Sequence, residues 1–225
     1  MAHGSHSRSP KKSVAKHVAD QRQFLEAELN PVLEAAEAEE GQVGDHHVFF
    51  VDAAHFVFGT FLCCLWSFKR LFVRAASGRQ RFNVLGAWNA VTRELIAVTN
   101  TTVVNTETMC QLLREVADRG LQGPITFVLD NAKYQRNAIV QALASELGVT
   151  LLYLPPYSPN LNLIERLWKF IKRQQLYGKY HACFDDFRTA IETCISEIPT
   201  VHRKRLQSLM TLKFQTFENV SLLAA

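Results

Sequence analysis

Hydrophobic and polar positions change their spacing several times along the chain, and each change predicts a secondary-structure element. Apolar residues over 14–40 recur at helical spacing, and Gly41 marks the end of that stretch. Within it, Asn30 and Pro31 predict a cap and a first-turn proline that restart the helix. From His46 onward the pattern changes to that of a domain built from strands and helices.

Five segments of this domain have the apolar runs or the alternation of strands. They span residues 47–58, 81–90, 94–100, 125–130 and 149–154. Helical spacing covers residues 105–119 and 134–147, a segment from 163 and a tail from about 184. The first three strands are joined by short connections and should be antiparallel, whereas the last two follow helices and should be parallel. The pattern predicts an α/β fold with a mixed five-stranded sheet flanked by helices.

Charge is distributed unevenly along the 225 residues, whose formal net charge is +4. Residues 23–46 contain acids but no Lys or Arg. We interpret residues 1–45 as a flexible lead and an acidic helical connector, and residues 46–225 as the domain with a helical tail. Residues 66–81 and 166–179 contain Lys and Arg but no acids. Such blocks favour a surface for a polyanion such as DNA, although solvated faces without a partner have the same composition.

Apolar runs are too short for a membrane protein. No stretch approaches 18 apolar residues, and the N-terminus has no apolar signal core. The five cysteines form no CxxC pair and have no His at zinc spacing. We therefore expect a cytoplasmic protein without a membrane span or a zinc site.

Three acidic residues occur at positions in or next to predicted strands and helices where a carboxylate has a structural or a functional role. Asp52 interrupts the most hydrophobic predicted strand, where it requires a cation or a hydrogen-bond donor, and an Arg from elsewhere in the fold is one alternative. Asp130 ends a buried strand, where it could face a ligand or cap the next helix. Glu165 lies in a first helical turn, where it could instead form a capping box with Asn162.

The predicted topology brings these three carboxylates together. A helix of about 14 residues runs back from Asp130 over about 21 Å, and the strand 149–154 returns to the same sheet edge. If the first strand pairs with the strand of Asp130, Asp52 faces the same cleft as Glu165. Oxygen-only ligands select Mg²⁺ or Mn²⁺, and two such ions about 3.5–4 Å apart suit phosphodiester chemistry. We predict that Asp52, Asp130 and Glu165 are both catalytic and metal-binding.

The segments around these acids resemble the catalytic blocks of a known family. They read FFVDAAHF, FVLDNAKYQ and LPPYSPNLNLIERLWKFIK, and 34 residues separate Asp130 from Glu165. These blocks resemble those of DDE transposases, in particular the bacterial insertion-sequence branch of the mariner superfamily. The resemblance spans roughly residues 46–175. The loop of the family usually reads Ser-Pro-Asp-Leu-Asn-Pro, whereas this chain has Asn160 and Leu163 in place of the Asp and the last Pro.

The resemblance implies a ribonuclease H-like fold and cut-and-paste DNA transposition with two Mg²⁺ ions, which Mn²⁺ can replace. It also implies double-stranded DNA partners, as element ends and a TA target, and a homodimer in the DNA complex. Two alternatives stay open: a nuclease that cuts without joining, and a catalytically silent DNA-binding protein.

The N-terminal part departs from the family. Relatives carry helix-turn-helix modules ahead of the catalytic domain, for which about 45 residues leave no room. We expect either an isolated catalytic domain or the second product of a split reading frame, with a separate polypeptide supplying the DNA-binding modules.

Polar residues next to the acids are further candidates. Basic side chains on the helix of Glu165 lie where a DNA backbone would run, although they could simply be solvated. Asn131 could orient a metal ligand or hold a turn. The predicted DNA contacts are Lys69, Arg70, Arg166, Lys169, Lys172 and Arg173.

Overall fold

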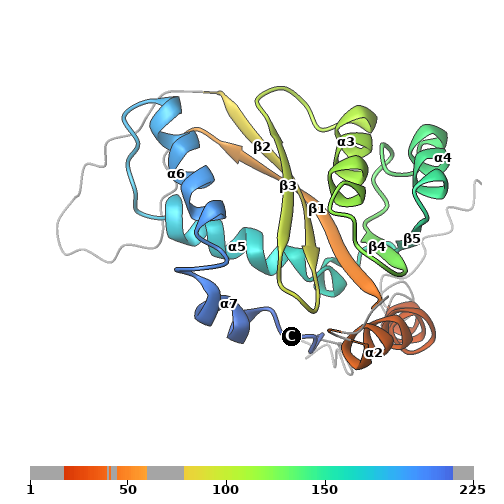
Figure 1. Cartoon of the computed structure of the whole chain (residues 1–225). Coiled ribbons are helices and arrows are strands. Elements are labelled where there is room, and N and C mark those ends of the chain that lie inside the picture. Colours follow the sequence, from red (N-terminus) through yellow and green to blue (C-terminus); the bar gives the residue numbers. More distant parts are fainter. Residues whose placement is uncertain (1–17, 40, 42–44, 60–78, 215–225) are drawn as a thin grey trace, which may run out of the picture.

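The computed structural model of this chain describes residues 18–39, 41, 45–59 and 79–214. A five-stranded sheet crosses the molecule, with α3 and α4 against one face and α5 and α6 against the other (Figure 1). Lys69 and Arg70 lie outside the described residues. No helix of the described part is long and apolar enough to cross a membrane.

The sheet has the mixed arrangement that the sequence predicted. Its strands run in the order β3-β2-β1-β4-β5. The pairs β1–β2 and β2–β3 are antiparallel, whereas β1–β4 and β4–β5 are parallel. The bounds are β1 (His47–Val57), β2 (Arg81–Asn89), β3 (Leu95–Asn100), β4 (Ile125–Leu129) and β5 (Val149–Tyr153).

Helices follow β3, β4 and β5, as expected for crossovers and a tail. The bounds are α3 (Thr106–Ala117), α4 (Ala138–Glu146), η2 (Pro159–Leu161), α5 (Ile164–Gln175), α6 (Phe184–Ser196) and α7 (Arg203–Leu209). The predicted start of the second helix at residue 134 was wrong. Residues 133–136 form turns, and the side chain of Asn137 caps the helix by accepting a hydrogen bond from the backbone N–H of Ile139.

Two apolar layers hold the sheet between the helices. Even-numbered residues of β1, such as Phe50 and Phe56, belong to the cluster that contains the buried face of α5 and α6. Odd-numbered residues, such as Phe49 and Val51, belong to the cluster with α3 and α4. Because strand side chains alternate between faces, Asp52 projects toward α5.

The N-terminal helix is continuous through Pro31. A π-helical turn, η1 (Leu25–Leu29), leads directly into α2 (Asn30–Ala38). Asn30 has helical dihedrals, so the prediction that it caps a new helix was wrong. The widened turn accommodates a proline that has no N–H and whose ring would collide with a regular preceding turn.

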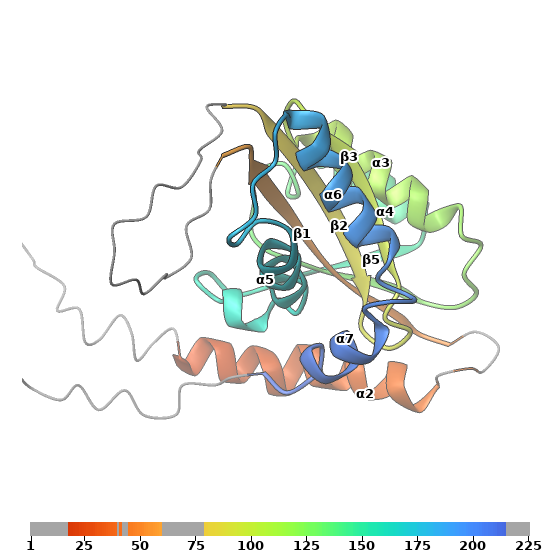
Figure 2. The same cartoon turned by 90° about the vertical axis from the view of Figure 1, so that its left-hand side faces the viewer.

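This helix contributes to the core rather than lying apart from it. It runs along the base of the molecule (Figure 2). Its buried side chains join the cluster that also contains α5: Phe24, Leu25, Leu29, Leu33 and Ala36. The division of the chain at residue 45 stays a prediction, but the helix and the domain share one apolar cluster.

Truncating this contact should destabilise the whole domain. Leu29 is fully buried, so we expect Leu29→Ala to lower the free energy of unfolding by about 2–5 kcal/mol in a urea titration. Glu28→Ala, on the exposed side of the same turn, should change it by about 0.5 kcal/mol or less. Equal, small effects of both variants would mean that the helix is a detachable connector.

Candidate active site

The three predicted acids line one cavity of about 220 Å³. Asp52 lies within β1, Asp130 directly follows β4, and Glu165 is in the first turn of α5. The parallel register pairs Val51 with Leu129. The next residue on each chain is therefore an aspartate, and the two carboxylates project from neighbouring positions on the same side of the sheet. Pairing of β1 with β4, on which the predicted convergence depended, is confirmed.

The capping box at the start of α5 is not formed. The N-cap position is Leu163, without a side-chain cap. Asn162 instead donates from Nδ2 to the backbone carbonyl of Val51, at 3.2 Å, and its Oδ1 is buried without a hydrogen-bond partner in the described part of the chain. Glu165 is thereby released from a capping role and forms an ion pair with Lys169, at 3.8 Å.

Asp130 does not cap α4 either, because Asn137 fills that position. Its Oδ1 accepts a long hydrogen bond of 3.4 Å from the N–H of Ala132, within the turn after β4. Asn131 donates to the carbonyl of Leu154 and accepts from Arg136. It therefore ties the ends of β4 and β5 together, and its role toward a metal ligand stays a prediction.

Asp52 carries the largest electrostatic strain of the site. In the described segments no Lys or Arg forms an ion pair with it, so the expected alternative of an Arg partner is not met there. Burial raises the pKa of Asp52 to about 7, and the charges of Asp130 and Glu165 add to that rise. The backbone N–H of Ala53 and the indole of Trp168 lower the pKa and so offset part of it.

A proline-rich loop closes one side of the cavity and is held by the N-terminal helix. Tyr157 has a positive φ of 60° and an exposed ring. Gln21 donates to the carbonyl of Tyr157 and accepts from Nδ2 of Asn160, both at 3.2 Å. Asn160, one of the departures from the family loop, is thus a contact between this loop and the helix.

Sequence analysis did not assign a role in the site to three residues near the acids. Asn162 was considered only as a cap. The pKa of Tyr134 is raised by burial and, to a smaller extent, by the charges of Asp130 and Asp52. The indole N–H of Trp168 is buried and has no partner of full hydrogen-bond geometry among the described residues, although it acts on Asp52.

The predicted DNA contacts have different surroundings. Arg166 donates to the backbone carbonyls of Leu209, Thr211 and Lys213, so its guanidinium holds the segment after α7. This arrangement gives no support to its predicted contact with DNA. Lys169 and Arg173 are exposed on α5, whereas Lys172 is half-buried, with its ammonium 6.0 Å from the centre of the Phe56 ring.

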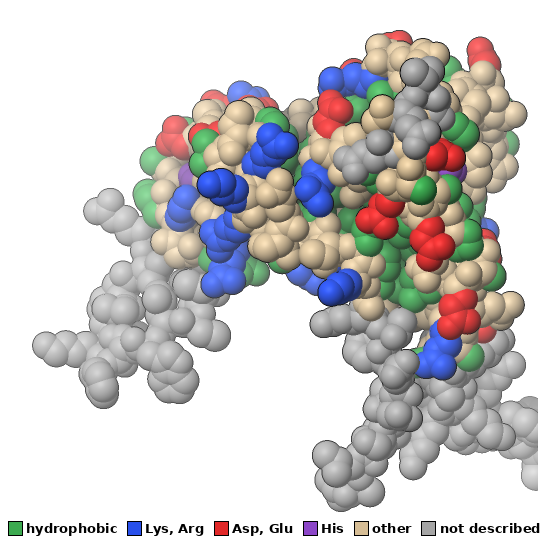
Figure 3. Space-filling view, turned by 60° about the horizontal axis from the view of Figure 1, so that its bottom comes forward, with side chains coloured by type: hydrophobic (Ala, Val, Ile, Leu, Met, Phe, Trp, Pro, Cys, Tyr) green, Lys and Arg blue, Asp and Glu red, His purple; other side chains and the backbone are tan. Residues whose placement is uncertain are grey.

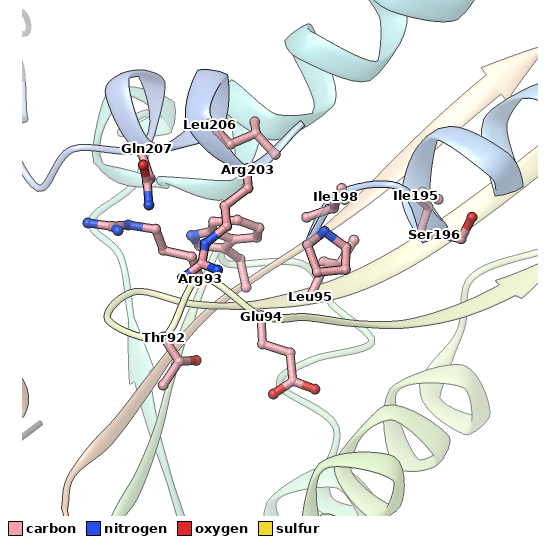
Figure 4. A pocket seen from close by; sticks show the side chains of 12 residues that line it. Thr92, Arg93, Glu94, Leu95, Ile195, Ser196, Ile198, Arg203, Leu206 and Gln207 are labelled. Carbon is pink, nitrogen blue, oxygen red and sulfur yellow. The ribbon is translucent and has the colours of Figure 1, made fainter. Parts of the chain in front are cut away.

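A second, larger cavity of about 490 Å³ lies between the β2–β3 turn and the α6–α7 region (Figure 4). From the turn, Arg93 extends toward two side chains of α7, Arg203 and Gln207. The acid in its lining, Glu94, forms an ion pair with Arg119 at 3.1 Å. This cavity lacks a cluster of carboxylates, so the smaller cavity is the candidate active site.

Comparison with known proteins agrees with this geometry. The family model described as "DDE superfamily endonuclease" matches residues 47–188, which include all three acids. The chain belongs to the DDE superfamily endonucleases. Its fold is also similar to that of the solved structure described as the Mos1 transposase paired-end complex with left transposon end, with a TM-score of 0.57. The two sequences are 13% identical, and the match covers 95% of this chain and 67% of that chain. For the Mos1 Strand Transfer Complex the TM-score is 0.58, with 14% identity over 96% and 66% of the two chains.

These similarities confirm the predicted ribonuclease H-like fold, which this chain shares with the Mos1 transposase structures. A relative from Sinorhizobium fredii, the uncharacterized protein y4pE/y4sA, is 31% identical over 88 residues. That alignment covers 38% of this chain and 62% of the relative, so this chain matches less than two thirds of that protein.

The donor set of the DDE cavity suits the divalent metals that DDE enzymes generally use. Carboxylate and amide oxygens of Asp52, Asp130, Glu165 and Asn162 line it. Within the described residues, no group of three or more His, Cys, Asp or Glu is arranged to hold one ion. Mg²⁺ is commonly held by one or two carboxylates with water and substrate phosphates. The metal-binding roles of Asp52, Asp130 and Glu165 therefore stay a prediction.

Stability of the metal-free protein should depend on the charge of Asp52. Its folded pKa of about 7 exceeds the ordinary aspartate value of 3.8, so ionising it costs stability as the pH rises through this range. We expect Asp52→Asn to gain about 1–4 kcal/mol of unfolding free energy relative to the wild type between about pH 4 and pH 8 in EDTA. Urea titrations at several pH values measure this gain.

The exposed Glu115→Gln provides the control, because its side chain lies on the outer face of α3. Its difference from the wild type should stay nearly constant with pH. A gap between Asp52→Asn and the wild type that shrinks with rising pH would contradict the assigned burial of Asp52.

Proposed function

We propose that this chain is the catalytic domain of a transposase that cuts DNA and joins the cut ends to target DNA in cut-and-paste transposition. The observation that carries the proposal is the convergence of Asp52, Asp130 and Glu165 on one cavity at the carboxyl edge of the sheet. The fold supports it, since the similar solved structures are a paired-end complex and a strand transfer complex of the Mos1 transposase.

In this proposal the acids hold two Mg²⁺ ions, which Mn²⁺ can replace. Asp52 and Asp130 are the adjacent pair from β1 and β4, and Glu165 approaches from α5. When bound, the ions activate a water or a 3′-hydroxyl for attack and stabilise the leaving oxygen of the phosphodiester. The amide of Asn162 ties β1 to the residues before α5 and so fixes the distance between the aspartates and Glu165.

The surface around α5 and α7 supports DNA as the substrate. Lys169 and Arg173 are exposed on α5, and Arg203, Lys204 and Arg205 are exposed on α7. On the face drawn in Figure 3, Lys and Arg side chains gather on one side and Asp and Glu on the other. Such separation directs a polyanion to one part of the surface. A homodimer that joins two element ends, a TA target and a separate DNA-binding polypeptide belong to the same proposal.

Removing one carboxylate charge should abolish chemistry and spare binding. We expect Asp130→Asn to retain fold and DNA affinity but to lose cleavage of labelled element-end DNA by about 100-fold or more in Mg²⁺ or Mn²⁺, because the amide is a poor ligand for these ions. Glu115→Gln, an exposed charge change on α3, should cut like the wild type. Any separate DNA-binding polypeptide is supplied in the reaction.

The products separate the alternatives. Cutting followed by joining supports the transposase, and cutting without joining supports a nuclease. A folded protein that binds DNA and does neither is the silent DNA-binding alternative. Wild-type rates for Asp130→Asn would remove this cavity as the active site.

A phosphate contact should be visible in the salt dependence of binding. We expect Arg173→Gln to weaken DNA binding similarly for all sequences and to reduce the slope of log affinity against log salt by about one. Arg119→Gln is the matched control, because Arg119 forms an ion pair with Glu94 outside the α5–α7 surface. Equal slopes for both variants and the wild type would exclude Arg173 from the DNA path.

A further inference from the structure

A tryptophan on α5 lies against the strand position opposite Asp52. In the antiparallel register of β1 and β2, the partner of Asp52 is Gly86. A Cβ atom at Gly86 would lie 2.8 Å from Cη2 and 2.9 Å from Cζ2 of Trp168, closer than such contacts allow. Residues opposite each other in an antiparallel pair project to the same face. The missing side chain of Gly86 therefore creates the space in which the indole lies beside the Asp52 carboxylate.

The polar edge of this indole lacks a fixed partner. Trp168 is 4% exposed, and its Nε1 has no hydrogen-bond partner of full geometry among the described residues. Leaving a buried donor unpaired is energetically unfavourable. Its contact with Asp52 lowers the pKa of that carboxyl but falls short of full hydrogen-bond geometry. A small rotation of that carboxylate is the local change that can pair the two.

The position of Trp168 on its helix links two of the proposed metal ligands. Glu165 and Trp168 are three residues apart, and residues at this spacing lie on one side of a helix. Ile164, on the same helix, also packs over Gly86. Any shift of the indole therefore moves α5, and with it Glu165, relative to Asp52.

We propose that Trp168 is a positioning residue: its indole N–H donates a hydrogen bond to one Asp52 oxygen and leaves the other oxygen oriented toward the metal. Gly86 is also needed for this arrangement, because a larger residue at this position displaces the indole of Trp168. The inference rests on the proposed function, in which Asp52 is a metal ligand. Hydrogen-bonded partners of metal ligands commonly change metal affinity by 10–100-fold when they are removed.

The test replaces the N–H and keeps the ring. Trp168→Phe removes the N–H and retains an aromatic group. Incorporation of 3-benzothienylalanine at position 168 exchanges only the N–H for sulfur, and it provides a folded variant if the phenylalanine variant unfolds. Trp88→Phe is the matched control. Trp88 lies on β2 and is fully buried, and its Nε1 also has no hydrogen-bond partner within the described ranges, but its strand partner is Phe50 rather than an acid.

Mn²⁺ affinity of the protein without DNA is the first measurement, by calorimetry. We expect both changes at position 168 to weaken Mn²⁺ binding by about 10–100-fold and Trp88→Phe to weaken it by about twofold or less. Gly86→Ala should weaken it as the changes at Trp168 do. Affinity for Mn²⁺ within twofold of the wild type in the folded benzothienylalanine variant would overturn the inference.

The indole proton resonances provide a measurement that needs no metal. The chain has three tryptophans, so the three signals can be assigned with the phenylalanine variants. We expect the Trp168 proton to move upfield in Asp52→Asn, because the charged acceptor is lost, and to move far less in Glu165→Gln. Equal responses to both variants would overturn the hydrogen bond.

The two measurements also separate this inference from the proposed function. A wild type that binds no Mn²⁺ contradicts the metal site, and the indole resonance then still decides whether Trp168 bonds to Asp52. Normal Mn²⁺ binding by the variants at Trp168, with loss of binding in Asp52→Asn, contradicts the positioning role alone.

Discussion

Parallel pairing of β1 with β4 is the constraint on which the rest of this structure depends. Its register makes Asp52 and Asp130 neighbours on one face of the sheet. Two carboxylates so placed repel each other, and burial adds to the cost of charging Asp52. The fold maintains this unfavourable arrangement because the strands are fixed by apolar layers on both faces. Strain of this kind is common where an enzyme recruits a cation.

The elements around Asp52, Asp130 and Glu165 fix the positions of these carboxylates rather than neutralise their charge. Asn162 ties the start of α5 to the carbonyl of Val51, beside Asp52. Trp168 packs on Gly86, opposite the same aspartate. Lys169 is the cation that meets Glu165, across an exposed 3.8 Å pair that contributes little stability. The cavity thus keeps a negative charge that suits divalent ions and, through them, a phosphodiester.

Support for the site extends to the N-terminal helix. Leu29 and its neighbours share the apolar cluster of α5, and Gln21 contacts the loop that closes the cavity. Movement of this helix would therefore be transmitted both to the helix of Glu165 and to the loop of Tyr157.

The sequence by itself determined the five strands, their parallel or antiparallel sense and the three acids, because these depend on local apolar patterns and on short motifs. It could not determine whether Asn162 and Asp130 cap helices, since a capping residue and a site residue have the same local pattern. Tertiary contacts decided this. The backbone carbonyl of Val51 accepts a hydrogen bond from the amide of Asn162, and Asn137 is the N-cap of α4. Only the packing of α5 revealed that Trp168 fills the space beside Gly86, because that contact joins residues 82 positions apart.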